Sequence, residues 1–159
     1  MLARYATHCW AVLGLCASQA IAALCTSNLL IDNFRGSMWR RNSLGLKVGD
    51  DGTMAAITVD LADGLITFVP GRMSYFYETL PCIDTVASGY GELAFTMKGP
   101  KDSSIALEIQ TTKSSTDTAS KSSWRYVAGF TGELQRMTVP INSFVGANAN
   151  AVNAFIWST

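Results

Sequence analysis

Residues 92–111, which read ELAFTMKGPKDSSIALEIQT, decide the fold of this chain. Apolar side chains occupy every second position in both halves of the stretch: Leu93, Phe95 and Met97, then Ile105, Leu107 and Ile109. A two-residue period is typical of a β-strand that buries one face, and the intervening Gly99-Pro100 ends a strand. The stretch therefore predicts two short strands joined by a turn.

The same period recurs along most of the chain. It predicts further strands over residues 54–60, 65–69, 74–80, 124–128, 134–139 and 152–157, with the strand at 74–80 ending at Pro81. No segment has the apolar stripe of a long helix, and residues 111–123 are so rich in Ser, Thr and Lys that we expect an exposed loop there. Many short strands separated by turn residues predict an all-β antiparallel sandwich.

The first residues have the composition of a secretory signal peptide. Arg4 precedes an apolar run over residues 10–17, and Ala20 and Ala22 are the small residues that a signal peptidase recognises. The run is much shorter than the ~20 residues that a membrane-spanning helix needs, which disfavours an N-terminal anchor. We therefore expect residues 1–22 to be cleaved, leaving a secreted domain over residues 23–159 with no membrane attachment.

The mature domain would retain two cysteines, Cys25 and Cys82. In an oxidising secretory compartment these two thiols can form one disulfide. Two separate thiols are equally compatible with the sequence, so both possibilities stay open.

Charge and histidine content exclude several classes of function. The chain has 12 basic and 12 acidic residues and a pI of about 6.5, so it lacks the positive charge of a protein that binds nucleic acid or an anionic membrane. The single histidine, His8, lies in the predicted signal peptide. The mature chain therefore has neither a Ser-His-Asp triad nor a histidine-ligated zinc centre, and nothing in it resembles a complete catalytic site.

Acidic side chains leave two other kinds of site open. Asp50-Asp51-Gly52 has the composition of a polar turn, but neighbouring carboxylates also suit a structural Ca²⁺ ion. Hydrolysis of a glycosidic bond needs only two carboxyl groups a few ångströms apart. The candidates for such a pair are Asp50, Asp51, Glu78 and Glu108.

Residues 74–79, Ser-Tyr-Phe-Tyr-Glu-Thr, form the densest aromatic stretch. Alternation places Tyr75 and Tyr77 on one side of the strand and Phe76 with Glu78 on the other. The two tyrosines either pack into the core or form an exposed platform on which sugar rings stack. A carboxylate is rarely buried without a partner, so Glu78 either faces outward or lies near the strand end with a partner.

Other strands carry side chains that would complete a sugar-binding face. Glu108 shares a face with Gln110, and Trp124 shares a face with Tyr126. Amide and carboxylate groups beside aromatic rings suit a neutral ligand with many hydroxyl groups. Polar residues are also the default on a sheet that faces solvent.

Short strings spread over nearly all of the mature chain occur together in one kind of domain: Leu30-Ile31-Asp32-Asn33-Phe34, Asn42-Ser43-Leu44-Gly45, Asp50-Asp51-Gly52-Thr53-Met54, Ser74-Tyr75-Phe76-Tyr77-Glu78-Thr79, Gly89-Tyr90-Gly91, Lys98-Gly99-Pro100, Leu107-Glu108-Ile109-Gln110-Thr111, Gly129-Phe130-Thr131-Gly132 and Gly146-Ala147-Asn148. Together they resemble a secreted fungal jelly-roll domain, which is similar to carbohydrate-binding modules of the galactose-binding-like type. That domain occurs alone or beside extracellular polysaccharide-processing enzymes. The resemblance implies a jelly-roll sandwich.

Two features depart from that domain. Its members carry a cysteine where this chain reads Lys113-Ser114-Ser115, as the partner of a cysteine that matches Cys82. They also continue past the strand that matches Phe155-Ile156-Trp157 to a further cysteine, the implied partner of Cys25. This chain ends at Thr159, so the resemblance implies a C-terminally truncated copy.

We therefore expect a monomeric jelly-roll sandwich, extracellular or in the cell wall, that binds a polysaccharide without cleaving it. The expected ligand-binding residues are Tyr75, Tyr77, Glu78, Gln110 and Trp124, and the expected ligands of a structural calcium ion are Asp32, Asp50 and Asp51. One alternative is a glycan-active enzyme that uses two of Asp51, Glu78 and Glu108. The other is a secreted structural or host-interaction protein with no sugar ligand.

Overall fold

Nine β-strands and one short 3-10 helix make up the regular structure of residues 28–36 and 40–159, the part of the chain that the computed structural model describes. In chain order they are β1 (Val48–Gly49), β2 (Ala56–Asp60), β3 (Leu65–Val69), β4 (Tyr75–Ile83), β5 (Glu92–Met97), β6 (Ser104–Thr111), β7 (Lys121–Ala128), β8 (Gln135–Pro140), η1 (Ile141–Ser143) and β9 (Val152–Ser158).

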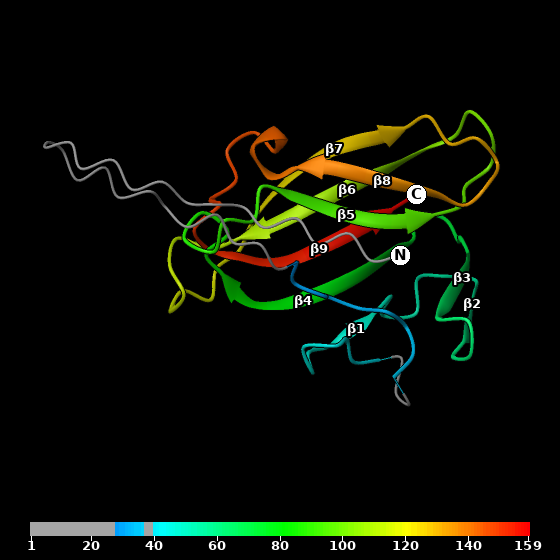
Figure 1. Ribbon diagram of the computed structural model, residues 1–159, viewed down its shortest axis with the longest axis horizontal. Helices are drawn as coiled ribbons and strands as arrows, with labels where there is room; N and C mark the ends of the chain where they lie inside the picture. Colours follow the sequence, from blue (N-terminus) through cyan, green and yellow to red (C-terminus); the bar gives the residue numbers. More distant parts are fainter. Residues whose placement is uncertain (1–27, 37–39) are drawn as a thin grey trace, which may run out of the picture.

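All strand pairs are antiparallel. β1, β4, β9, β6 and β7 form a five-stranded sheet in that order, β5 pairs with β8, and β2 forms a hairpin with β3. Figure 1 shows β5 and β8 lying over the five-stranded sheet, with β1 and the β2–β3 hairpin on the lower side of the view. The chain therefore passes repeatedly between two layers.

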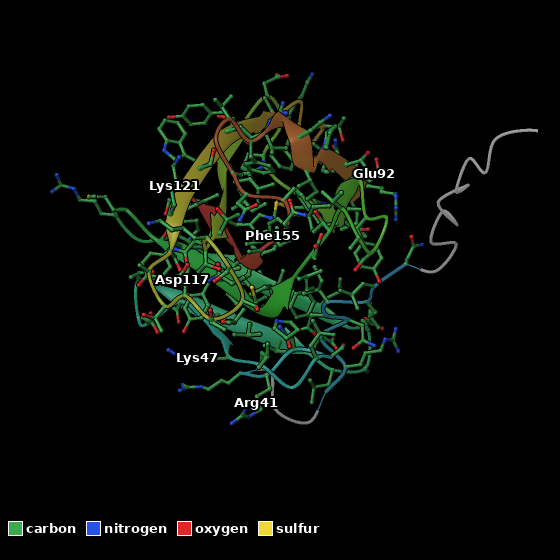
Figure 2. The ribbon with its side chains drawn as sticks, turned by 90° about the vertical axis from the view of Figure 1, so that its left-hand side faces the viewer. Arg41, Lys47, Glu92, Asp117, Lys121 and Phe155 are labelled. Atoms are coloured by element: carbon green, nitrogen blue, oxygen red, sulfur yellow. The ribbon has the colours of Figure 1, made fainter. Side chains whose placement is uncertain are left out.

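The two layers enclose one apolar core. Its buried members include Leu107, Ile109 and Phe155 from the five-stranded sheet and Leu93 and Val139 from β5 and β8. In Figure 2, Phe155 lies between the layers, Lys121 on the side of the five-stranded sheet and Glu92 on the side of β5. The predicted all-β, antiparallel, sandwich-like fold is confirmed.

One local difference from the predicted strands occurs at Pro81. The sequence predicted that the strand ends there, whereas β4 continues to Ile83. Its pairing with β9 is irregular between Thr79 and Ile83, and Cys82 has a positive φ of 52°. A bulge of this kind takes residues out of the hydrogen-bond ladder, so a proline without an N–H is tolerated.

A second difference concerns the Ser/Thr-rich segment. β7 begins at Lys121, earlier than the predicted start at Trp124, because Lys121 and Ser122 already pair with the end of β6. Thr111 and Thr112 are buried, so the fully exposed loop is confined to residues 113–120. The predicted loop is therefore present but shorter.

Several predictions concern the N-terminal part of the chain. The predicted signal peptide over residues 1–22, and Cys25, lie outside the described residues. A disulfide between Cys25 and Cys82 stays a prediction. Within residues 28–36 and 40–159 no helix has both the length and the apolar character needed to cross a membrane.

Candidate ligand-binding face

The outer face of the five-stranded sheet carries most of the aromatic residues that the sequence singled out. The register across β4, β9, β6 and β7 aligns Tyr77 with Ile156, Ile156 with Glu108, and Glu108 with Trp124. Directly opposed residues of antiparallel strands point to the same face of a sheet. This central row therefore has an aromatic ring at each end.

Two further rows run beside the central one. Their members are Tyr75, Ser158, Ala106 and Tyr126 in the first, and Thr79, Ala154, Gln110 and Ser122 in the second. An aromatic pair on β4 (Tyr75 and Tyr77) and an aromatic pair on β7 (Trp124 and Tyr126) thus stand on opposite sides of a strip of small and polar side chains.

The tyrosines of β4 face outward because the inner face of this strand serves the core. Phe76 is 2% exposed and packs against Phe68 and Trp157, with ring centroids 4.7 and 6.4 Å away. Alternation then directs Tyr75 and Tyr77 to the outer face, where both are partly buried. Of the two possibilities that the sequence left open for the tyrosines, packing in the core is therefore wrong.

The face is hollowed next to the tyrosine pair. The hollow has a volume of about 650 Å³ and is lined by β4, β9 and β6, with Lys47 and Asp51 at its edge. Its other lining side chains include Tyr77, Glu108, Gln110 and Ser158. This volume lies in the range of pockets that hold small molecules or short oligomers.

Asp51 holds the tyrosine pair. Its Oδ1 accepts a hydrogen bond from Tyr77 Oη at 2.9 Å and forms an ion pair with Lys47 Nζ at 3.0 Å, while its Oδ2 accepts from Tyr75 Oη at 3.3 Å. Lys47 Nζ also lies 5.2 Å from the centroid of the Tyr77 ring. The hydrogen bonds from Lys47 and Tyr77 lower the pKa of the Asp51 carboxyl, which favours the carboxylate.

A tight turn places Asp51 beside the tyrosines. Asp51 and Gly52 both have positive φ, 48° and 81°, and the backbone N–H of Thr53 donates to the carbonyl of Asp50 at 2.9 Å. Asp50 Oδ2 accepts a further hydrogen bond from Met54 N at 2.9 Å. The interpretation of Asp50-Asp51-Gly52 as a polar turn is confirmed.

Polar groups on β6 and β7 form a second cluster near Trp124. Glu108 Oε1 accepts hydrogen bonds from Gln110 Nε2 at 3.1 Å and from Ser122 Oγ at 2.6 Å. No described residue donates to the other oxygen, Oε2. Beside this cluster Trp124 and Tyr126 are 60% and 64% exposed, with their rings edge to face at 5.8 Å.

Glu78 lies on the other side of the sheet, contrary to the expectation from the sequence. It is 2% exposed and accepts a hydrogen bond from Asn42 Nδ2 at 3.1 Å. Burial raises the pKa of Glu78 to about 8, and the nearby Asp32 carboxylate adds to the rise although the Asn42 hydrogen bond opposes it. Because alternation directs Glu78 inward with Phe76, it is not available to a ligand that contacts the tyrosines.

The three aspartates predicted to hold calcium have separate partners. Asp32 Oδ1 accepts from Phe34 N at 2.8 Å, Asp50 caps the turn described above, and Asp51 holds the tyrosines. Among the described residues no three His, Cys, Asp or Glu side chains lie close enough together to hold a metal ion. The structure therefore does not bring Asp32, Asp50 and Asp51 together as one site.

Sequence reasoning missed several members of this face, among them Lys47, Ile156 and Ser158. Alternation shows which residues of one strand share a face, but it does not show which strands are neighbours. β9 lies between β4 and β6 in the sheet, although it is the last strand of the chain. No signal in the sequence could have found this neighbourhood.

The face thus combines four of the predicted contact residues (Tyr75, Tyr77, Gln110 and Trp124) with Lys47, Asp51 and Glu108. It has aromatic rings at its two sides, partly buried on β4 and exposed on β7, with hydrogen-bonding groups between them. Comparison with known proteins adds no relative, since no protein-family model, no curated protein and no solved structure matches this chain significantly.

Proposed function

We propose that this chain is a secreted, non-catalytic domain that binds extracellular or cell-wall polysaccharide through the outer face of its five-stranded sheet. The observation that carries the proposal is the arrangement of two solvent-accessible aromatic pairs on the two sides of a polar strip. Aromatic rings cover the apolar C–H faces of sugars, and amide and carboxylate groups bind their hydroxyl groups.

We also infer that the two layers form a jelly roll. The order β1-β4-β9-β6-β7 in one sheet and the pairing of β5 with β8 in the other support this topology, because the chain changes layer between β4 and β5, β5 and β6, β7 and β8, and β8 and β9. In such a fold the outer face of a sheet is a rigid platform for a ligand.

The positions of the acidic residues favour binding over hydrolysis. A glycosidase needs a carboxylic acid that is protonated near neutral pH and lies beside a second carboxylate. Glu78, whose burial raises its pKa to about 8, lies beside Asp32 on the inner face, but it is 2% exposed and lies away from Asp51 and Glu108, so a sugar on the outer face does not reach it. Asp51 is engaged by Lys47 and both tyrosines.

Retention on insoluble polysaccharides tests the proposal. The secreted protein should be retained by at least one of chitin, β-glucan, cellulose and xylan. Tyr77→Ala and Trp124→Ala should each weaken that retention by about tenfold, since each removes one ring contact. Leu134→Ala is the matched control, because Leu134 is 57% exposed but lies next to β8, in the other layer. A parallel arm with EDTA tests the calcium ion predicted from the sequence.

Lack of retention on every polymer by a folded protein would overturn the proposal. If a protein partner is recovered instead, and Tyr77→Ala and Trp124→Ala each abolish its binding, the structural or host-interaction alternative would be favoured. Release of shortened sugars from any polymer would instead favour the enzyme.

A further inference from the structure

We propose that the ligand is a neutral polysaccharide whose chain runs across the strands, so that one chain contacts the tyrosine pair on β4 and the Trp124–Tyr126 pair on β7 at the same time. This inference rests on the proposed function and specifies the ligand class and the direction of the chain.

The first argument is the distance between the two aromatic pairs. Tyr77 and Trp124 are separated by β9 and β6, with Ile156 and Glu108 as the intervening members of the row. Adjacent strands lie ~4.8 Å apart, so the backbones of β4 and β7 are about 14 Å apart at this row. One pyranose ring cannot bridge that distance, whereas an oligosaccharide can.

The second argument concerns direction. Along β4 the tyrosines are followed on the same face by Thr79, and along β7 Trp124 is preceded by Ser122. A chain that ran parallel to the strands would therefore leave one aromatic pair unused. Only a chain that crosses the strands can contact both the tyrosine pair on β4 and the Trp124–Tyr126 pair on β7.

The third argument concerns the strip between the rings. On β9 and β6 the outward residues of the two aromatic rows are Ser158, Ala106, Ile156 and Glu108. Three of them are short or apolar and leave room for a sugar chain. Glu108 has one carboxylate oxygen without a donor among the described residues, and this oxygen can accept a hydrogen bond from a sugar hydroxyl.

The fourth argument is the charge of the hollow. Among the residues that the structure describes, Lys47 is the only cation that lines it, and its ammonium is paired with Asp51. Glu108 contributes a carboxylate that is bonded to Gln110 and Ser122 rather than to a cation. A polysaccharide that carries carboxylates or sulfates would meet net negative charge and, among the described lining residues, no unpaired cation, which disfavours its binding.

Calorimetric titration of the secreted protein with oligosaccharides of defined length tests both parts of the proposal. The neutral series comprises di- to hexasaccharides of β-glucan, xylan and chitin, and oligogalacturonates of equal length are the anionic probe. Affinity for the neutral ligand should rise with length until both aromatic pairs are occupied. It should change little between low and high NaCl, because no charge pairs with the ligand.

Two variants make the crossing of the strands measurable. Tyr77→Ala and Trp124→Ala should each lower the affinity for a hexasaccharide by about tenfold, whereas only one of them should affect a disaccharide, which can occupy one aromatic pair alone. Glu108→Gln should lower the affinity for the neutral ligand several-fold and raise the weak affinity for the oligogalacturonate. Leu134→Ala should leave all these affinities unchanged.

The outcomes separate this inference from the proposed function. Three results would overturn the inference while leaving polysaccharide binding intact. They are equal affinity for disaccharide and hexasaccharide, an equal loss of disaccharide affinity in Tyr77→Ala and Trp124→Ala, and tighter binding of the oligogalacturonate than of the neutral ligand. Failure of every oligosaccharide and every polymer to bind would overturn the proposed function itself.

Discussion

Tyr77 Oη donates a hydrogen bond of 2.9 Å to Asp51 Oδ1, and this contact joins the turn between β1 and β2 to the strand that carries the tyrosine pair. Asp51 also accepts from Tyr75 and pairs with Lys47, so a single carboxylate restrains three side chains at the edge of the hollow. Side chains that are ordered before a ligand binds lose less conformational entropy on binding. We infer that Asp51 positions the rings for a ligand that it need not touch.

Substitution of Asp51 should therefore weaken binding through the tyrosines. Asp51→Gly removes both hydrogen bonds that the carboxylate accepts from the tyrosines, and glycine adopts the φ of 48° without strain. Asp51→Asn keeps one oxygen acceptor but loses the charge that pairs with Lys47. The affinity measured by calorimetry should fall in the order wild type, Asn, Gly, with a loss of about three- to tenfold for Gly. Equal affinity in all three proteins would show that the rings do not depend on this carboxylate.

Glu78 should make the folded protein less stable as the pH rises. The pKa of Glu78 is about 8 in the folded protein and near the ordinary 4.5 in the unfolded chain. Between these two values the folded state holds more protons than the unfolded state, so the free energy of unfolding decreases as the pH rises, by about 5 kcal/mol in total. Urea unfolding at pH 5 and pH 8.5 measures most of this loss.

Glu78→Gln provides the control for this pH dependence. Glu78 Oε1 and Asp32 Oδ2 are buried without partners among the described residues, and a protonated Glu78 can donate to Asp32. A glutamine amide makes the same donation at any pH. The variant should therefore lose most of the pH dependence and exceed the wild type in stability at pH 8.5. If the free energy of unfolding of the variant still decreases with pH as in the wild type, other groups cause the pH dependence.

Cys82 should form a disulfide with a cysteine introduced at position 112. Its Sγ lies 3.7 Å from Thr112 Oγ1, so the two side chains already face each other. Under oxidising conditions Thr112→Cys should stabilise the protein by about 2–4 kcal/mol relative to its reduced form. Mass spectrometry of tryptic peptides without reduction identifies the pair. Two free thiols at these positions after oxidation would contradict the geometry.

Alanine substitutions at two glycines with positive φ, Gly52 and Gly64, distinguish the cost of backbone strain from the cost of a steric clash with another part of the chain. A Cβ at Gly64 would lie 2.6 Å from the carbonyl oxygen of Asn33, whereas a Cβ at Gly52 would have no heavy atom within 4 Å. Gly52→Ala should cost about 1–2 kcal/mol of stability, the usual cost of left-handed backbone at a residue with a side chain. Gly64→Ala should cost at least ~1 kcal/mol more because of the clash. Equal chemical unfolding midpoints would contradict that contact.

The strands were largely predictable because alternation is a local property. Residues 92–97 and 104–111 form β5 and β6 nearly as the apolar spacing predicts, and the tyrosines of β4 lie opposite Phe76 as alternation requires. The extension of β4 past Pro81 was not predictable, since it depends on a bulge against β9. The burial of Glu78 also escaped prediction, because its partner Asn42 comes from a distant part of the chain.

The sequence by itself determined the all-β class, which residues of each strand share a face, and which residues carry aromatic and polar chemistry. It did so because side chains alternate along an extended backbone whatever the neighbouring strands are. Only the tertiary structure decided that the last strand, β9, lies between β4 and β6, and that Tyr77 and Trp124 therefore belong to one row. Strand order is set by the packing of both layers around one core, which no local period records.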